Sequence, residues 1–579
     1  MKKFIRRFCV LWVLLVVFCT YTTHALADKS AQPQTIAGLG TATFPTSTHS
    51  PDAQTAFIRG LLLLHVFEYE DAARAFQTAE KIDPAFAMAY WGEAMTYNHP
   101  VWNQLDVPAG QAALSKLAPT PKARAALIED PRERAYLGTV EILYDGKGTK
   151  LERDALYATA MQALAQSYPS DDEAQLFYSL ALLGRSDSVR DVPVYLQAAA
   201  IAKAVYRRNP NHPGAAHYWI HGMDDPAHAA GALEAARSLS KIAPDAGHAQ
   251  HMCSHIFMAL GMWDAVVDAN IQAMRVVDDQ DRAAGRYLLD CGHYDVWLMY
   301  GYDQQGRHQD AEKALAACQS TGQQALAWMD AHPGQPSSSP RSRQRLIERN
   351  NSSLVIMRGT AVIESRQWNG TAASMIIDTA NLGPNAGWDA FTTGYAAAQR
   401  GALPAAQVSL KNLDQIKETY RANPKAEKEP MAYLDILSDC LGGLIASKSG
   451  DMPAAITQVK RAAATYDNMA FDFGPPPILK PPHELLGELL LKDGKPKQAA
   501  EAFQSSLKRA PNRSLSLLGL AKAQDASGDK VAATATYKQL LTIWKTADAG
   551  SPDVAEARLY VATASSEQFP PTIRTNHRP

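Results

Sequence analysis

Small and large apolar residues recur along the chain at fixed offsets, and this pattern predicts a helical repeat. Gly487 is followed by a small residue after 12 positions, an aromatic residue after 16 and a proline after 24. The small and aromatic positions recur 34 residues later, from Ala521, and an earlier copy of the whole pattern starts at Gly60. A 34-residue period is typical of helix–turn–helix units. The matched positions 8, 20, 24, 27 and 32 are Gly487, Ala499, Phe503, Ser506 and Pro511, and also Gly60, Ala72, Phe76, Ala79 and Pro84.

Each of these positions has a physical role in such a unit. Small residues at positions 8 and 20 let the two helices approach closely, and a large residue at position 24 fills the space between units. A proline near position 32 ends the second helix because it cannot continue the hydrogen-bond ladder. No single unit buries its apolar face, so the units are stable only when stacked. We therefore expect an all-α solenoid, best matched over residues 54–100, 213–320 and 437–545.

At these motif positions the sequence resembles the tetratricopeptide-repeat (TPR) family. The blocks YWGEAMTYNHPVW and PDAGHAQHMCSHIF are also similar to blocks of secreted bacterial TPR proteins whose subgroup is uncharacterised, although such relatives often read His-Met-Pro-Ser-His where this chain has Cys253. The resemblance implies a right-handed superhelix in which the first helix of each unit lines a concave groove. It also implies that the groove holds a partner protein, a peptide or a small ligand.

The first residues predict export. Four basic residues precede a short apolar run, and Ala25-Leu26-Ala27 follows as a signal-peptidase site. We expect a periplasmic or extracellular protein after cleavage near Ala27, and we expect no membrane span in the mature chain. The predicted organisation is a signal peptide (1–27), an extended lead-in (28–52), an N-terminal TPR-like solenoid with a histidine cluster (53–332), a loop or linker (333–345), a C-terminal TPR-like solenoid (346–564) and a disordered tail (565–579).

Charge and cysteine content narrow the function further. Removing the four basic signal residues leaves 57 − 4 = 53 Lys and Arg against 59 Asp and Glu, a formal charge of −6. That balance argues against a nucleic-acid partner, which needs a concentrated basic face. The mature chain keeps four cysteines, and the sequence does not show whether any of them pair.

Histidine is concentrated in one part of the chain, where seven of the 16 lie within residues 212–255. One pair falls at positions 5 and 9 of a unit, and a second pair falls at the same positions of the next unit. Position 2 of the second unit is also a histidine. Positions 2, 5 and 9 share one helix face, and neighbouring helix axes lie about 8–10 Å apart. The five residues are His217, His221, His251, His255 and, at position 2, His248.

We interpret these five histidines as a site for a transition metal, zinc or copper, because both ions accept imidazole ligands. Four of the rings, from the two pairs, can converge on one ion. The alternative is that they bind an organic ligand or bond to each other. The chain has no HExxH, GxSxG, GxxxxGK[ST] or paired CxxC motif, so the sequence assigns no catalytic residue and no organic cofactor.

Other polar residues are expected to face the same groove. Asp225 lies one turn beyond His221 and is a candidate ligand or partner of a ligand. His293 opens a later helix at position 2. Further groove candidates, from the first and last repeats, are Glu93, His99, His483 and Glu484.

Two functions follow from these features. The first is an exported TPR scaffold that binds a partner or ligand in its groove and carries a histidine-rich metal site. The second is a metal-dependent enzyme in which the histidines hold an ion that activates water, oxygen or substrate, and Glu93 or Glu484 serves as a base.

Overall fold

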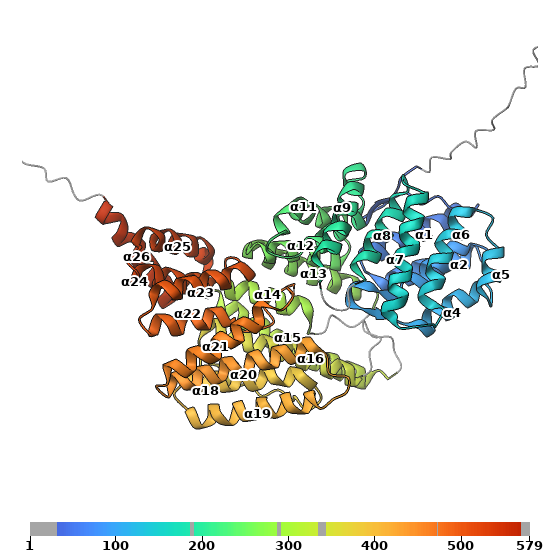
Figure 1. Ribbon diagram of the computed structural model, residues 1–579. Helices are drawn as coiled ribbons and strands as arrows, with labels where there is room; N and C mark the ends of the chain where they lie inside the picture. Colours follow the sequence, from blue (N-terminus) through green and yellow to red (C-terminus); the bar gives the residue numbers. More distant parts are fainter. Residues whose placement is uncertain (1–31, 186–189, 286–290, 334–342, 472, 569–579) are drawn as a thin grey trace, which may run out of the picture.

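The computed structural model describes residues 32–185, 190–285, 291–333, 343–471 and 473–568. The expected signal peptide, the centre of the expected linker and the last residues of the tail lie outside these ranges. Within them the chain forms 26 α-helices and two small two-stranded hairpins (Figure 1). The prediction of an all-α solenoid is confirmed. No helix in the described ranges has both the length and the apolar character needed to cross a bilayer.

The first half of the solenoid follows a short antiparallel hairpin, β1 (Gln34–Ile36) with β2 (Gly40–Ala42), inside the predicted lead-in. A second hairpin, β3 (Asn98–His99) with β4 (Gln104–Leu105), follows the third helix. The helices are α1 (Pro51–His65), α2 (Tyr69–Ile82), α3 (Ala87–Met95), α4 (Val107–Leu117), α5 (Pro121–Ala126), α6 (Pro131–Tyr144), α7 (Lys150–Ser167), α8 (Asp172–Leu183), α9 (Val192–Arg208), α10 (Pro213–Gly222), α11 (Leu233–Ile242), α12 (Gly247–Ala259), α13 (Trp263–Ala283), α14 (His293–Gln304) and α15 (His308–Ala331).

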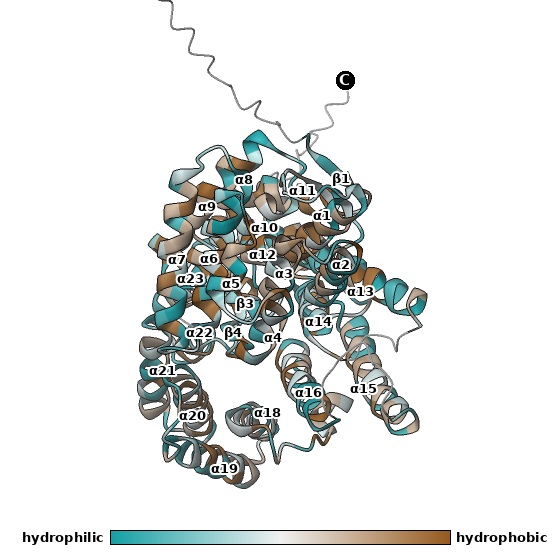
Figure 2. Cartoon of the chain, turned by 90° about the vertical axis from the view of Figure 1, so that its right-hand side faces the viewer, coloured by the Kyte–Doolittle hydropathy of each residue, from teal (hydrophilic) through white to brown (hydrophobic). Residues whose placement is uncertain are grey.

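The second half begins with α16, which starts inside the predicted linker, and ends with α26, which continues into the predicted tail. Figure 2 shows hydrophobic and hydrophilic residues on the same helices, as expected for helices that bury one face. These helices are α16 (Arg343–Ser365), α17 (Thr371–Ser374), α18 (Ala386–Gln399), α19 (Leu403–Arg421), α20 (Lys428–Lys448), α21 (Met452–Asp467), α22 (Pro482–Lys492), α23 (Pro496–Arg509), α24 (Ser514–Ala526), α25 (Lys530–Ile543) and α26 (Pro552–Gln568).

The packing between units agrees with the roles assigned from the sequence. Phe503, at position 24, is fully buried in α23. A β-carbon placed on Gly487 of its own unit would lie 2.8 Å from the Phe503 ring, and one placed on Gly519 of the next unit would lie 2.2 Å from it. Phe76 lies in the same way between Gly60 and Gly92. The glycines are therefore required by the large residue that fills the space between units.

The solenoid also makes contacts between units that are far apart in sequence. The indole Nε1 of Trp263 donates to the carbonyl oxygen of Asn512 at 2.9 Å. Lys545 pairs with Asp264 at 2.5 Å. Since about 250 residues separate these partners, the C-terminal repeats return to the turn between α12 and α13.

Replacing Phe503 by alanine tests the packing between units. The change should lower stability by about 3–5 kcal/mol, because it leaves a cavity that two helices cannot both close. Chemical denaturation followed by circular dichroism should show a transition at lower denaturant concentration. The exposed Val531, 78% accessible, provides the control, since Val531→Ala should change stability by less than about 0.5 kcal/mol. Equal midpoints for the two variants would contradict this account of the fold.

Candidate metal centre

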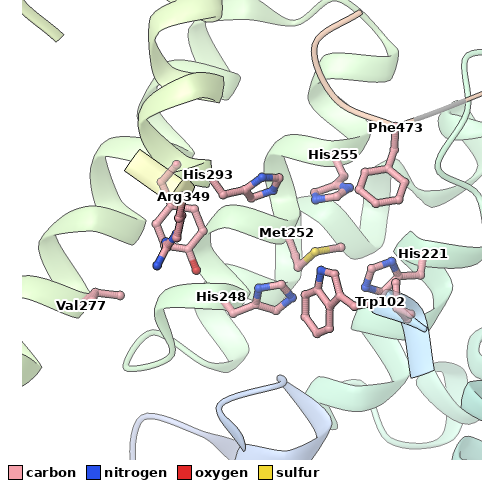
Figure 3. A pocket seen from close by; sticks show the side chains of 11 residues that line it. Trp102, His221, His248, Met252, His255, Val277, His293, Arg349 and Phe473 are labelled. Carbon is pink, nitrogen blue, oxygen red and sulfur yellow. The ribbon is translucent and has the colours of Figure 1, made fainter. Parts of the chain in front are cut away.

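A cavity of about 420 Å³ lies where residues of five helices and two connecting segments meet (Figure 3). Histidines line it from α10, α12 and the first residue of α14. Trp102 closes one side from the turn between β3 and β4, and Phe473 closes another from the proline-rich segment before α22. The lining histidines are His221, His248, His255 and His293.

The histidines form two sets of three. In each set the possible ligand nitrogens lie within 4.8 Å of one another. The structure thus groups the rings differently from the single four-histidine ion predicted from the repeat, and it adds His293, which the sequence suggested only as a groove residue. We call His217, His221 and His248 the first set, and His251, His255 and His293 the second set.

The tautomer of His217 follows from its contacts. Its Nδ1 lies 2.7 Å from the carbonyl oxygen of His65, and a carbonyl oxygen can only accept, so Nδ1 carries the hydrogen. The neutral ring then has a lone pair on Nε2. That Nε2 is buried and has no hydrogen-bond partner among the described residues, and the same is true of Nε2 in His221 and in His248.

In the second set, two of the three rings also carry their hydrogen on Nδ1. His251 Nδ1 lies 2.7 Å from Asn270 Oδ1. The Asn270 amide is oriented by its nitrogen, which donates to the Val266 carbonyl at 2.8 Å, so Oδ1 faces His251 and accepts. His255 Nδ1 lies 2.6 Å from a carboxylate oxygen of Asp224 and donates to it. The Nε2 atoms of these two rings lie 3.2 Å apart. With both Nδ1 atoms protonated, two lone pairs face each other at this distance, and they attract only if a proton or another cation lies between them.

Burial favours the neutral form of four of these rings. Loss of solvent lowers the pKa of His217 from 6.5 to about 3. Burial, and then the neighbouring histidines, also lower the pKa values of His221, His248 and His251 well below 6.5. Neutral imidazoles are the form that binds metal ions. The arrangement therefore offers two sets of imidazole nitrogens next to one cavity.

The carboxylate behind the second set is Asp224, whereas the sequence pointed to Asp225. The helix α10 ends at Gly222, so the helical phase that placed Asp225 one turn beyond His221 no longer applies there. Asp225 instead binds Arg190 at 3.1 Å and His228 at 2.8 Å.

Two predicted groove carboxylates pair with cations elsewhere. Glu93 accepts from Lys116 at 2.6 Å and from Gln77 at 2.7 Å, so it faces α2 and α4. Glu484 is buried between Lys480, at 2.9 Å, and Arg513, at 2.8 Å. Neither side chain contacts a histidine of the two sets in the described structure.

The two remaining candidates also lie apart from the sets. His483 bonds to Asp467 at 2.8 Å at the surface. His99 stacks on Tyr69 with ring centroids 3.9 Å apart, and its Nε2 lies 3.0 Å from the Thr96 carbonyl oxygen. His99 therefore packs beside Trp102, which forms one wall of the cavity. The ring centroids of His99 and Trp102 lie 6.3 Å apart.

A third histidine cluster, which the sequence did not reveal, supports the first set. His65 and His212 each bond to Glu173, at 2.6 and 2.8 Å, and His65 also bonds to the hydroxyl of Tyr218 at 2.9 Å. The two histidines hold the pKa of the Glu173 carboxyl below its usual value against the effect of burial. Because the polar atoms of this cluster are paired, its role is to hold His65, whose carbonyl oxygen orients His217.

Phe67 is a further residue that the sequence analysis missed. It lies at the turn after α1, seven residues after Gly60, where later units have Gly450, Gly494 or Gly528. All four residues have positive φ, 60° for Phe67 and 93°, 71° and 88° for the glycines. The Phe67 ring lies 4.4–5.7 Å from those of all three histidines of the first set. A phenylalanine where the repeat calls for glycine is a signal that could have located it.

Comparison with known proteins adds little on the site. No family model and no curated protein matches the chain. Among solved structures, yeast Tom70 is similar over 89% of this chain and 96% of its own, with 11% identity and a TM-score of 0.27. The TPR domain of P58(IPK) matches 82% of this chain and 98% of its own, at 13% identity and a TM-score of 0.22. The human IFIT1 dimer covers 87% and 92%, at 12% identity and a TM-score of 0.27. Scores this low indicate neither the shape of the superhelix nor a function.

The tautomer of His217 can be measured in the metal-free protein. With a pKa of about 3, the ring should stay neutral and carry its hydrogen on Nδ1 down to about pH 5. Long-range ¹⁵N–¹H correlation spectra of histidine-labelled protein distinguish the two tautomers, and the His217→Ala variant assigns the signal. An Nε2–H tautomer, or a charged ring at about pH 6, would contradict the deduced geometry.

Proposed function

We propose that this protein is a solenoid scaffold that binds transition-metal ions through its two histidine sets. The observation that supports the proposal most is the convergence of buried Nε2 atoms that have no hydrogen-bond partner among the described residues. Leaving a buried acceptor without a partner costs about 1–3 kcal/mol, and this cavity contains several. A bound metal ion would give several of these nitrogens a partner at once. Hydrogen bonds from Nδ1 to a carboxylate, an amide and a carbonyl oxygen are the usual supports of metal-binding histidines.

Zinc and copper are the ions that suit the donors. Both accept neutral imidazole, whereas harder ions such as magnesium and manganese prefer carboxylate and carbonyl oxygens. The carboxylate of Asp224 accepts a hydrogen bond from Nδ1 of His255, so it contacts the ring on the side opposite Nε2. The form of the enzyme hypothesis in which Glu93 or Glu484 acts as a base is not supported, since each is held in an ion pair outside the cavity.

We also propose that the protein works outside the cytoplasm, in the periplasm or beyond. The signal-like N-terminus supports export, and so does the disulfide between Cys291 and Cys318, because disulfides persist in oxidising compartments. The groove of the solenoid would then hold a partner protein, a peptide or a small ligand next to the metal site.

Metal content tests the proposal directly. The mature protein, purified without a histidine tag and dialysed, should retain zinc or copper when measured by mass spectrometry. The double variant His217→Ala plus His251→Ala removes one donor from each set and should lose the metal while keeping its helical circular dichroism. His332→Ala, which changes an exposed histidine outside the sets, is the matched control and should retain the metal. Substoichiometric amounts of every transition metal in the unmodified protein would refute the proposal.

The carboxylate behind His255 gives a second test. Asp224→Asn replaces an acceptor-only partner with an amide that can also donate, so the ring loses its fixed tautomer. Metal affinity should fall about 10–100-fold, as it does when such supporting partners are removed. Asp225→Asn, which changes the neighbouring carboxylate that binds Arg190, should leave the affinity nearly unchanged. Competition titrations against a chromophoric chelator measure both, and equal losses in the two variants would contradict the assignment.

A further inference from the structure

The six histidines are arranged for two ions. A metal–nitrogen bond of about 2.0–2.1 Å places the nitrogens around one tetrahedral ion about 3.3 Å apart. Each set, with its nitrogens within 4.8 Å, closes on one ion by small ring rotations. Between the sets, the ring centroids of His221 and His255 lie 5.9 Å apart, and those of His248 and His251 lie 6.1 Å apart. The sets are therefore neighbours that share one cavity.

Resting on the proposed metal binding, we infer that the cavity holds two copper(I) ions, one in each histidine set, and that dioxygen binds between them. The three ligands of each ion leave an open coordination position, as in metal sites that bind substrate. Because His221, His248, His255 and His293 all line the cavity, the open positions face the same space.

The charge of the donors favours monovalent ions. All six ligands are imidazoles, which bind a metal ion as uncharged donors, and no carboxylate belongs to either set. At equal separation, two divalent ions repel each other four times as strongly as two monovalent ions, because Coulomb energy scales with the product of the charges. The pair that this donor set tolerates best is therefore copper(I), the monovalent state of copper.

The remaining walls suit copper(I) and a small uncharged ligand. Met252 lines the cavity between the two sets (Figure 3), and a thioether is a soft group that suits copper(I). Trp102 and Phe473 supply apolar surface on two sides. A volume of about 420 Å³ is far more than dioxygen needs, so a further organic molecule also fits.

The binding step balances without any other reactant. Each copper(I) gives one electron to dioxygen and becomes copper(II), and the O–O bond order falls from two to one. The bound ligand is then a peroxide dianion. It takes up no proton, and its two negative charges offset the two positive charges that the ions gain. The same anion is attracted by Arg349. Release of dioxygen returns both electrons to the ions.

The experiment uses the full mature chain, stripped of metal and loaded with copper(I) without oxygen. We expect two copper ions per chain. Admitting dioxygen should produce an intense charge-transfer absorption in the near ultraviolet. It should produce no copper(II) electron paramagnetic resonance signal, because two copper(II) ions that share a bridging ligand couple magnetically. Evacuation should reverse the absorption.

Two variants separate the sets. His248→Ala removes a donor of the first set only, and His293→Ala removes one of the second set only. Each should reduce copper from two ions to one, abolish the dioxygen band and give a resonance signal once oxidised. His293 is an exposed residue at the start of α14, so its variant should fold, and circular dichroism verifies this. His332→Ala should behave like the unmodified chain.

The outcomes distinguish this inference from the proposed function. One copper ion per chain in the unmodified protein would overturn the two-ion inference and leave the metal site standing. Two ions that give no oxygen-dependent band, or that oxidise to uncoupled copper(II), would overturn dioxygen binding. Failure to bind either copper or zinc would overturn the proposed function itself.

Discussion

The candidate site depends on one interaction, the hydrogen bond that each anchored histidine donates from Nδ1 to an oxygen atom that accepts it. A free imidazole can carry its hydrogen on either nitrogen, and a buried one uses that freedom to satisfy itself. Here His217, His251 and His255 have no such freedom, because a carbonyl, an amide oxygen and a carboxylate hold the hydrogen at the rear of each ring. The lone pairs are left at the front, where they converge. The partners come from three different parts of the solenoid, so the stacking of units determines the chemistry of the cavity.

The fold also carries backbone strain next to this cavity. Phe67 adopts a left-handed conformation that costs a non-glycine residue about 1–3 kcal/mol, at a turn where later units have glycine. Glycine would be the stable choice for the turn, but it would leave the first set without the aromatic ring that packs on all three of its histidines. The strained turn therefore lowers local stability, while the Phe67 ring excludes water from one side of the histidine rings. Strained residues of this kind are concentrated at functional sites.

The sequence predicted the parts of the site that depend on a single repeat. His217 and His251 occupy the same position 34 residues apart, and equivalent positions of stacked units lie on neighbouring helices, so their proximity followed from phase alone. The division into two sets did not follow, since it depends on the rotations of individual rings. His293 joins the second set through its ring contact with His251, with centroids 4.6 Å apart. The sequence pointed to Asp225 because helical phase was extended past Gly222, where the helix has already ended, whereas the carboxylate that contacts His255 in the structure is Asp224.

The sequence could not reveal that the C-terminal repeats return to contact the start of α13. We call this contact the closure of the solenoid. The direction of a superhelix accumulates from small rotations at each unit, so contacts between distant units cannot be predicted from any one repeat. This closure brings Phe473 to within 5.2 Å of His255 between ring centroids. It also holds α14 at its far end, where Gln304 accepts from the backbone nitrogen of Ser514 at 2.9 Å. Since His293 begins the same helix, the second histidine set is held in place by repeats about 200 residues further along the chain. A solenoid that closes in this way positions side chains through contacts between distant units as well as between neighbouring ones.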